Sequence, residues 1–179
     1  MRKARGERAA RPLDETALRE LAMAYVARFA TTAAKLRSYL GRKLRERGWD
    51  GAEEPDLDRL TARMVELGLV DDRAFAEARS RSLLARGYGE RRVSQVLAAA
   101  GVADEDRTDA RTLAQDQAFE AALRFARKRR LGPFAAQPQH DPKLRDKALA
   151  AMMRAGHSFA VAKAVLELSN SGNEPRLLP

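Results

Sequence analysis

Apolar residues recur along the chain at intervals of three and four positions, and no segment alternates apolar and polar residues over the length of a strand. This spacing is typical of amphipathic helices that each bury one stripe. The first stripe begins after Asp14 and consists of Leu18, Leu21, Ala22, Tyr25 and Phe29. We therefore expect an all-α fold.

Two further stripes follow before residue 70. A threonine, Thr31 or Thr32, is expected to cap the second helix. Its apolar residues are Leu36, Tyr39, Leu40 and Leu44. The third helix is expected to start near Pro55, because the missing N–H of proline has no partner in a first helical turn. Its apolar residues are Leu57, Leu60, Met64 and Leu67.

The same order of helices then recurs. Gly48, Gly101 and Gly156 end the three middle helices, and they are 53 and 55 residues apart. Each follows an apolar residue by four positions, and near-equal spacing of this kind indicates internal duplication. The alternative is an unrelated helical bundle. We expect an elongated array of three tandem three-helix, helix-turn-helix-like repeats, at residues 14–69, 70–113 and 114–169.

Three segments do not fit the repeat pattern. Residues 1–13 are rich in arginine and are expected to form a basic flexible tail, and residues 170–179 a second flexible tail. Residues 131–142, LGPFAAQPQHDP, contain three prolines and a glycine. We expect them to form an irregular loop inserted into the third repeat.

Residues 68–92, GLVDDRAFAEARSRSLLARGYGERR, join the first two repeats. Asp71 and Asp72 stand where a helix begins, so their carboxylates can accept its free N–H groups and complement its dipole. Gly87 and Gly89, on either side of Tyr88, are expected to end that helix. A new helix is expected to start near Glu90.

Composition narrows the class of partner. The 179 residues carry 34 Lys and Arg against 25 Asp and Glu, a net charge of +9, with an isoelectric point near 10.4. Such an excess favours a polyanion or an acidic protein surface, although a basic surface can also serve solubility alone. The chain has no cysteine and no membrane-length apolar run. We expect a cytoplasmic, soluble monomer without membrane contact.

Clustered cations mark the expected binding surface. A solvated helix face would explain any one of them, so only their grouping favours a function. The first repeat contributes Lys35, Arg42, Arg45 and Arg47. The second contributes Arg79, Arg81, Arg86, Arg91 and Arg92, together with Tyr88 as the one aromatic residue placed for stacking on a base. The third contributes Arg124, Arg127, Lys128, Arg129 and Arg130.

Catalytic chemistry is not expected. His140 lies in the proline-rich loop, and His157 follows a helix-ending glycine, where a capping or surface role is the default. Neither has metal-ligand spacing to a second histidine or to a thiolate. Paired acids stand at expected helix starts, and Gly87-Tyr88-Gly89 lacks the residues of a phosphate-binding loop. We therefore expect no catalytic residue, no cofactor and no metal.

The order Gly68-Leu69-Val70-Asp71-Asp72-Arg73-Ala74-Phe75-Ala76, followed by Arg86-Gly87-Tyr88-Gly89, resembles the RecX family of recombination regulators. The resemblance covers residues 18–168 and is clearest in the first two repeats. It implies a non-enzymatic modulator that binds in the groove of the RecA filament on single-stranded DNA. There it would inhibit filament extension, and with it strand exchange, ATP hydrolysis and coprotease activity in DNA repair.

The chain departs from the family pattern at two caps. A Ser-x-x-Glu capping box often opens the second helix in such proteins, whereas here Thr32 is followed three positions later by Lys35, which predicts a weaker cap. Glu90 stands where proline is common, and either residue can begin a helix. Two other functions stay open: a helix-turn-helix-like protein that binds DNA, including duplex DNA, without RecA, and an adaptor that binds only proteins.

Overall fold

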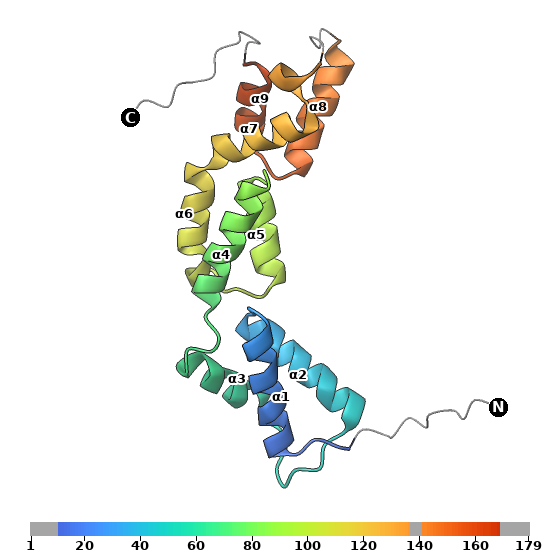
Figure 1. The fold of residues 1–179 in the computed structure, drawn as a ribbon, viewed down its shortest axis with the longest axis vertical. Helices are drawn as coiled ribbons and strands as arrows, with labels where there is room; N and C mark the ends of the chain where they lie inside the picture. The colour runs from blue at the N-terminus through green and yellow to red at the C-terminus, as the bar shows by residue number, and fades with distance from the viewer. Residues whose placement is uncertain (1–10, 137–140, 169–179) are drawn as a thin grey trace, which may run out of the picture. The chain divides into compact units, whose positions relative to one another are not determined.

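The computed structural model describes residues 11–136 and 141–168. In that part of the chain all regular elements are helices, apart from one bridge between Leu13 and Trp49. The α-helices are α1 (Glu15–Arg28), α2 (Ala33–Arg47), α3 (Leu57–Glu66), α4 (Asp72–Ala85), α5 (Glu90–Ala99), α6 (Thr108–Asp116), α7 (Ala118–Arg129), α8 (Pro142–Arg154) and α9 (Phe159–Leu166) (Figure 1). Two short 3-10 turns, η1 (Glu105–Arg107) and η2 (Gly132–Phe134), complete the set. The expected all-α class is confirmed.

The α-helices follow one another as three triplets, α1–α3, α4–α6 and α7–α9, which is the expected tandem arrangement. Helix α6 continues to Asp116, past residue 113, so the exact limits of the repeats stay predictions. By packing, the described residues form two compact units. The first unit holds the residues up to Phe75 together with Ala100–Val102, and the second holds Ala76–Ala99 and the residues from Ala103 onward.

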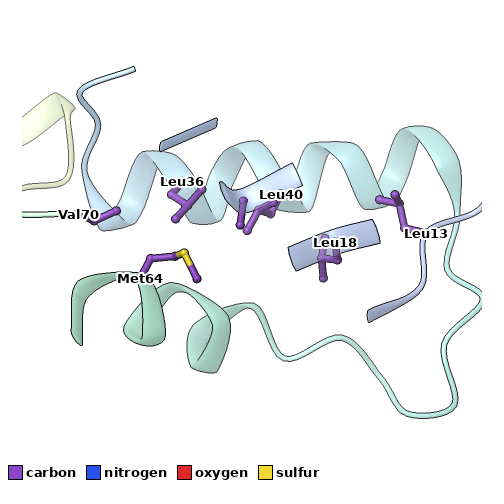
Figure 2. Close-up of a cluster of buried hydrophobic side chains, with 7 residues drawn as sticks. Leu13, Leu18, Leu36, Leu40, Met64 and Val70 are labelled. Atoms are coloured by element: carbon purple, nitrogen blue, oxygen red, sulfur yellow. The ribbon is translucent and has the colours of Figure 1, made fainter. Parts of the chain in front are cut away.

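The first unit has a leucine-rich core between α1, α2 and α3. Leu36 and Leu40 of α2 point toward Met64 of α3, with Leu18 of α1 beside them (Figure 2). All four are nearly inaccessible to solvent, as is Leu13 just before α1. Two backbone bonds fix Leu13, since its N–H donates to the Gly48 carbonyl and its own carbonyl accepts from the Asp50 N–H. The first three predicted stripes therefore meet in one core.

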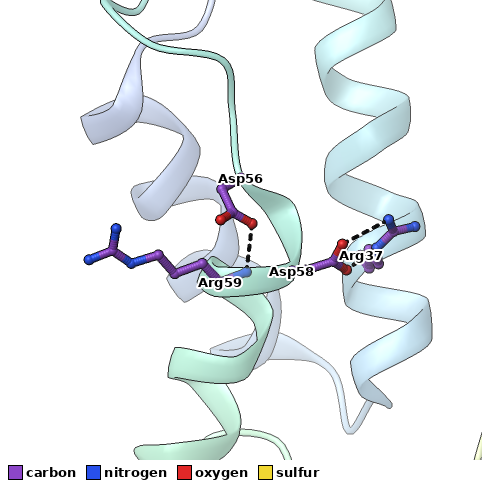
Figure 3. Close-up of polar contacts among 4 residues, drawn as sticks. All are labelled: Arg37, Asp56, Asp58 and Arg59. Carbon is purple, nitrogen blue, oxygen red and sulfur yellow. Dashed lines mark hydrogen bonds and ion pairs between the residues drawn. The ribbon is translucent and has the colours of Figure 1, made fainter.

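Polar contacts align α3 against α2 at the surface of this unit. Arg37 of α2 makes a two-pronged ion pair with Asp58 of α3 (Figure 3). The hydrogen bond from Arg37 lowers the pKa of the Asp58 carboxyl, and it raises that of the guanidinium. Asp56 accepts a hydrogen bond of 2.8 Å from the Arg59 N–H and so caps α3. The expected start near Pro55 is wrong by two residues, because this side-chain cap fixes the first turn at Leu57.

Two residues assigned to buried stripes are exposed. They are Phe29 and Leu67, with exposed fractions of 52% and 49%. Both lie just beyond a helix end: Phe29 follows α1 in an extended conformation that takes it off the helical stripe, and Leu67 follows α3. Periodicity extrapolated past a helix end overstates burial, because the backbone there no longer follows the helical path.

The second unit has an alanine-rich core at its C-terminal end. Ala122 and Ala126 of α7 pack with Met152 of α8 and with Ala162 and Val165 of α9. Small side chains let these helices approach closely. Of the expected loop 131–142, residues 131–136 and 141–142 are described; among them, Gly132–Phe134 forms η2 and Pro142 is the first residue of α8. Asp141 caps that helix, and His140 lies outside the described residues.

Candidate functional site

The turn Gly87-Tyr88-Gly89 packs directly on the end of α8. The Gly89 N–H donates to the Ala155 carbonyl at 3.0 Å, and the Arg91 N–H donates to the Gly156 carbonyl at 3.1 Å. A Cβ on Gly89 would overlap the Gly156 carbonyl group, and one on Gly87 would lie 2.9 Å from the Phe125 nitrogen. Only glycine permits this approach of two backbones.

The first unit contains a second contact of the same kind. The Thr32 hydroxyl donates to the Ala100 carbonyl at 2.6 Å, and a Cβ on Gly101 would overlap the Ala34 side chain. In both places, the glycine that follows the middle helix of one triplet packs against the start of the middle helix of the triplet before it. The carbonyl of the residue just before that glycine accepts a hydrogen bond from the same helix start. We call this contact the glycine seat. A Cβ on Gly48, the equivalent glycine of the first triplet, would have nothing within 4 Å.

The acidic pair of the 68–92 motif serves helix starts, as expected, but at two different helices. Asp71 accepts from the Ala74 N–H at 2.8 Å and caps α4. Asp72 instead accepts from the Ala33 N–H at 2.9 Å, in the first turn of α2. Of the two threonine candidates, Thr32 is the cap, at 3.2 Å from the Lys35 nitrogen. The missing capping-box glutamate is thus offset by a carboxylate from a distant part of the sequence.

His157 is buried beneath the turn, contrary to its expected capping or surface role. It is 2% exposed, its ring packs on Phe125, and its Nε2 lies 3.1 Å from the Gly87 carbonyl oxygen. Burial lowers the pKa of this imidazole, and the Gly87 contact offsets part of that effect. His157 immediately follows Gly156, so the close packing of Gly156 on the start of α5 places the histidine ring in the interior of the second unit.

Tyr88 borders a pocket of about 460 Å³ in the second unit. Phe125, Arg129 and Leu131, from the end of α7 and just after it, line one side, and Ala151, Arg154 and Ala155 of α8 and its cap line another. The guanidinium carbon of Arg86 lies 5.6 Å from the centroid of the Tyr88 ring. Arg154 is absent from the expected surface, because it stands alone in the sequence and adjoins the other cations only through the packing of α8.

The densest group of cations ends α7. Arg127, Lys128, Arg129 and Arg130 are all exposed. Arg127 lies over the Phe134 ring and Arg129 over the Phe125 ring, at 5.2 and 5.9 Å from the centroids. Positive charge is favourable at a helix C-terminus, where the macrodipole is negative. These cations are thereby held beside one another in contact with solvent, where they are available to a polyanion.

Other cations of the expected surface differ in how freely they could bind. Lys35, Arg45, Arg79, Arg86, Arg91 and Arg92 are exposed. Arg42 and Arg81 pair with glutamates one turn away, Glu46 and Glu77. Arg47 donates to the Arg11 carbonyl at 2.8 Å, and Arg124 donates to the Leu84 carbonyl at 3.3 Å. These last two support the fold more than they offer a free charge.

A larger groove in the first unit has a different character. It is lined by α1, α3 and the segment between Trp49 and Asp56, and it has a volume of about 880 Å³. Its charged lining residues are Glu15, Glu53, Glu54, Asp56, Glu66, Arg19, Arg59 and Arg63. Carboxylates outnumber guanidiniums here, so this groove suits phosphate less well than the end of α7.

The described residues contain no cluster of histidines and acids able to hold a metal ion. None of the helices in the described ranges is long and apolar enough to cross a membrane.

Comparison with known proteins identifies relatives over nearly the whole chain. The family model "RecX, second three-helix domain" matches residues 71–110. The "Regulatory protein RecX" of Myxococcus xanthus is 35% identical over 173 residues, which cover 93% of this chain and 92% of the relative. That of Mycobacterium sp. strain JLS is 36% identical, with 92% and 90% covered.

Solved structures share the fold. The crystal structure of RecX from Lactobacillus salivarius has a TM-score of 0.67 at 17% identity and covers 85% of this chain and 94% of its own. A second crystal structure, of a regulatory protein RecX, has a TM-score of 0.67 at 20% identity, with coverage of 86% and 71%. At such identities the likeness concerns the fold alone.

Proposed function

Because the chain belongs to the RecX family of regulatory proteins, we propose that it binds a RecA recombinase filament on single-stranded DNA and restrains the activities of that filament. It does so as a binding protein rather than an enzyme. The activities concerned are strand exchange, ATP hydrolysis and coprotease function. We also propose that it acts as a monomer in the cytoplasm.

The observation that carries this proposal is the group of exposed cations at the end of α7, next to Tyr88, on a chain with a net charge of +9. Lys and Arg side chains that neutralise phosphates release counterions, which gives affinity for any nucleic acid. Repeat arrays also present long surfaces, because each unit contacts mainly its neighbours. A surface of this kind suits a nucleoprotein filament better than it suits a small ligand.

ATP hydrolysis by RecA on single-stranded DNA tests the proposal. We expect the protein to lower the hydrolysis rate at stoichiometric amounts, and an R127A/K128A variant to do so less well. The matched control is Arg63→Ala, since Arg63 is paired with Glu66 in the first unit. An unchanged rate with the intact protein would refute the proposal. DNA binding with no effect on RecA would favour a helix-turn-helix-like DNA-binding protein instead.

A further inference from the structure

Tyr88 is held in place by backbone contacts rather than by its own side chain. Gly87 on one side packs against the Phe125 backbone, and Gly89 on the other packs against Gly156. The Tyr88 N–H donates to the Leu83 carbonyl at 3.0 Å. An aromatic residue at the tip of a turn is therefore fixed at both ends, half-buried, and directed to a pocket whose walls come from other helices.

The chemistry of that pocket is cationic and aromatic. Among the described residues that line it, Arg129 and Arg154 are exposed guanidiniums, and none is acidic. Tyr88 and Phe125 supply the two aromatic rings, and Leu131, Ala151 and Ala155 supply apolar surface. Its volume of about 460 Å³ lies within the range of small-ligand pockets, roughly 300–1,000 Å³.

We propose that this pocket receives a single unpaired base of a single-stranded nucleic acid, stacked on Tyr88, while Arg129 and Arg154 contact the flanking phosphates. Proteins that bind single strands combine a positive track for the backbone with aromatic rings for the bases. A base inside a duplex has both faces covered, so this pocket favours single strands. The inference rests on the proposed DNA contact. It adds recognition of an unpaired base, which the positive charges alone do not provide.

Binding without RecA separates this inference from the proposed function. Fluorescence anisotropy is recorded for three labelled strands of equal length: oligothymidylate, an abasic deoxyribose-phosphate strand, and a duplex. We expect oligothymidylate to bind tightest. Stacking on one aromatic side chain contributes about 1–3 kcal/mol, so Tyr88→Ala should weaken oligothymidylate binding about tenfold and leave the abasic strand unaffected.

Three further variants keep the test informative if Tyr88→Ala disturbs folding. Tyr88→Phe retains the ring and should bind as the unaltered protein does, because stacking does not need the hydroxyl. Arg154→Ala should weaken all single strands, and Arg111→Ala, an exposed arginine of α6 away from the pocket, should weaken them less. Oligouridylate should bind comparably, since stacking does not read the sugar.

Equal affinity for oligothymidylate and the abasic strand would overturn the base pocket and assign binding to the phosphates alone. Equal loss in Tyr88→Phe and Tyr88→Ala, or failure of oligouridylate to bind, would overturn stacking as its basis. None of these outcomes decides the proposed function, because its separate criterion is the rate of RecA-dependent ATP hydrolysis.

Discussion

The Nε2 atom of His157 lies 3.1 Å from the carbonyl oxygen of Gly87. A carbonyl can only accept a hydrogen bond, so Nε2 must carry the proton. Nδ1 is then the bare nitrogen, and it is buried without a hydrogen-bond partner among the described residues. A second proton on Nδ1 would be a buried donor with no acceptor, which agrees with the lowered pKa of this histidine.

Acid should therefore destabilise the protein through His157. Its pKa is lowered in the folded state and is near 6.5 in the unfolded chain, so below about pH 6.5 the unfolded chain binds more protons. The free energy of unfolding should fall as the pH drops through 6.5, by at most about 1.4 kcal/mol per pH unit from this group. Urea unfolding at pH 7.5 and 5.5 measures the change. His157→Gln retains a donor and should show a weaker pH dependence, and equal dependence would contradict the assignment.

Gly89→Ala tests the glycine seat. A methyl group there overlaps the Gly156 carbonyl, so we expect a loss of roughly 1–3 kcal/mol in unfolding free energy, as for overpacked sites. Gly41→Ala is the matched control. Gly41 lies inside α2, and a methyl group added there would make only ordinary contacts at 3.6 Å, so alanine should stabilise the helix by about 0.5–1 kcal/mol. Thermal melts measure the stability of both variants. If the melting temperatures of both shifted in the same direction, the close contact at the glycine seat would not be supported.

Two adjacent threonines give a matched test of the α2 cap. Thr32→Val removes both the cap at Lys35 and the bond to Ala100, and should cost about 1–2 kcal/mol. Thr31 is also buried, but its hydroxyl has no hydrogen-bond partner in the described ranges. Thr31→Val should accordingly be neutral or stabilising. Chemical denaturation measures both, and similar losses in the two variants would show that the hydrogen bonds of Thr32 contribute little.

The cations at the end of α7 should set the salt dependence of single-strand binding. Each phosphate contact contributes about 0.7 to the slope of log affinity against log salt for single strands. Neutralising Arg127 and Lys128 together should reduce that slope by about 1.4. Arg37→Ala, which removes a paired cation, should change the slope less. Titrations of a labelled strand at several salt concentrations provide the measurement, and an unchanged slope in the double variant would exclude this cluster from the contact.

The sequence predicted the helices and their order in triplets better than it predicted which helices pack against one another. Periodicity records which face of a helix is buried, and so Leu18, Leu36 and Leu40 were assigned correctly. It does not record which helices pack together, nor where a helix ends. The expected burial of Leu67 was therefore wrong, because α3 ends one residue earlier. The spacing of Gly48, Gly101 and Gly156 indicated repetition, but not that two of these glycines pack on another helix start.

The candidate site divides in the same way. Arg127, Lys128 and Arg129 are adjacent in sequence, and their clustering is visible without a structure. Tyr88 was recognised by its two glycines. Arg154 was missed and His157 misassigned, because both depend on how α8 and its end pack against the turn before α5. The sequence contains no local pattern for such long-range neighbours.

The glycine seats also bear on how far a sequence of this type can diverge. Their hydrogen bonds are made by backbone atoms and one hydroxyl, and their close contacts need small residues such as glycine and Ala34, so they constrain only a few positions of the sequence. Many other positions could then change without touching these contacts. Solved structures that share only 17% and 20% of their residues with this chain have its fold, a divergence of the extent that so few constrained positions would allow.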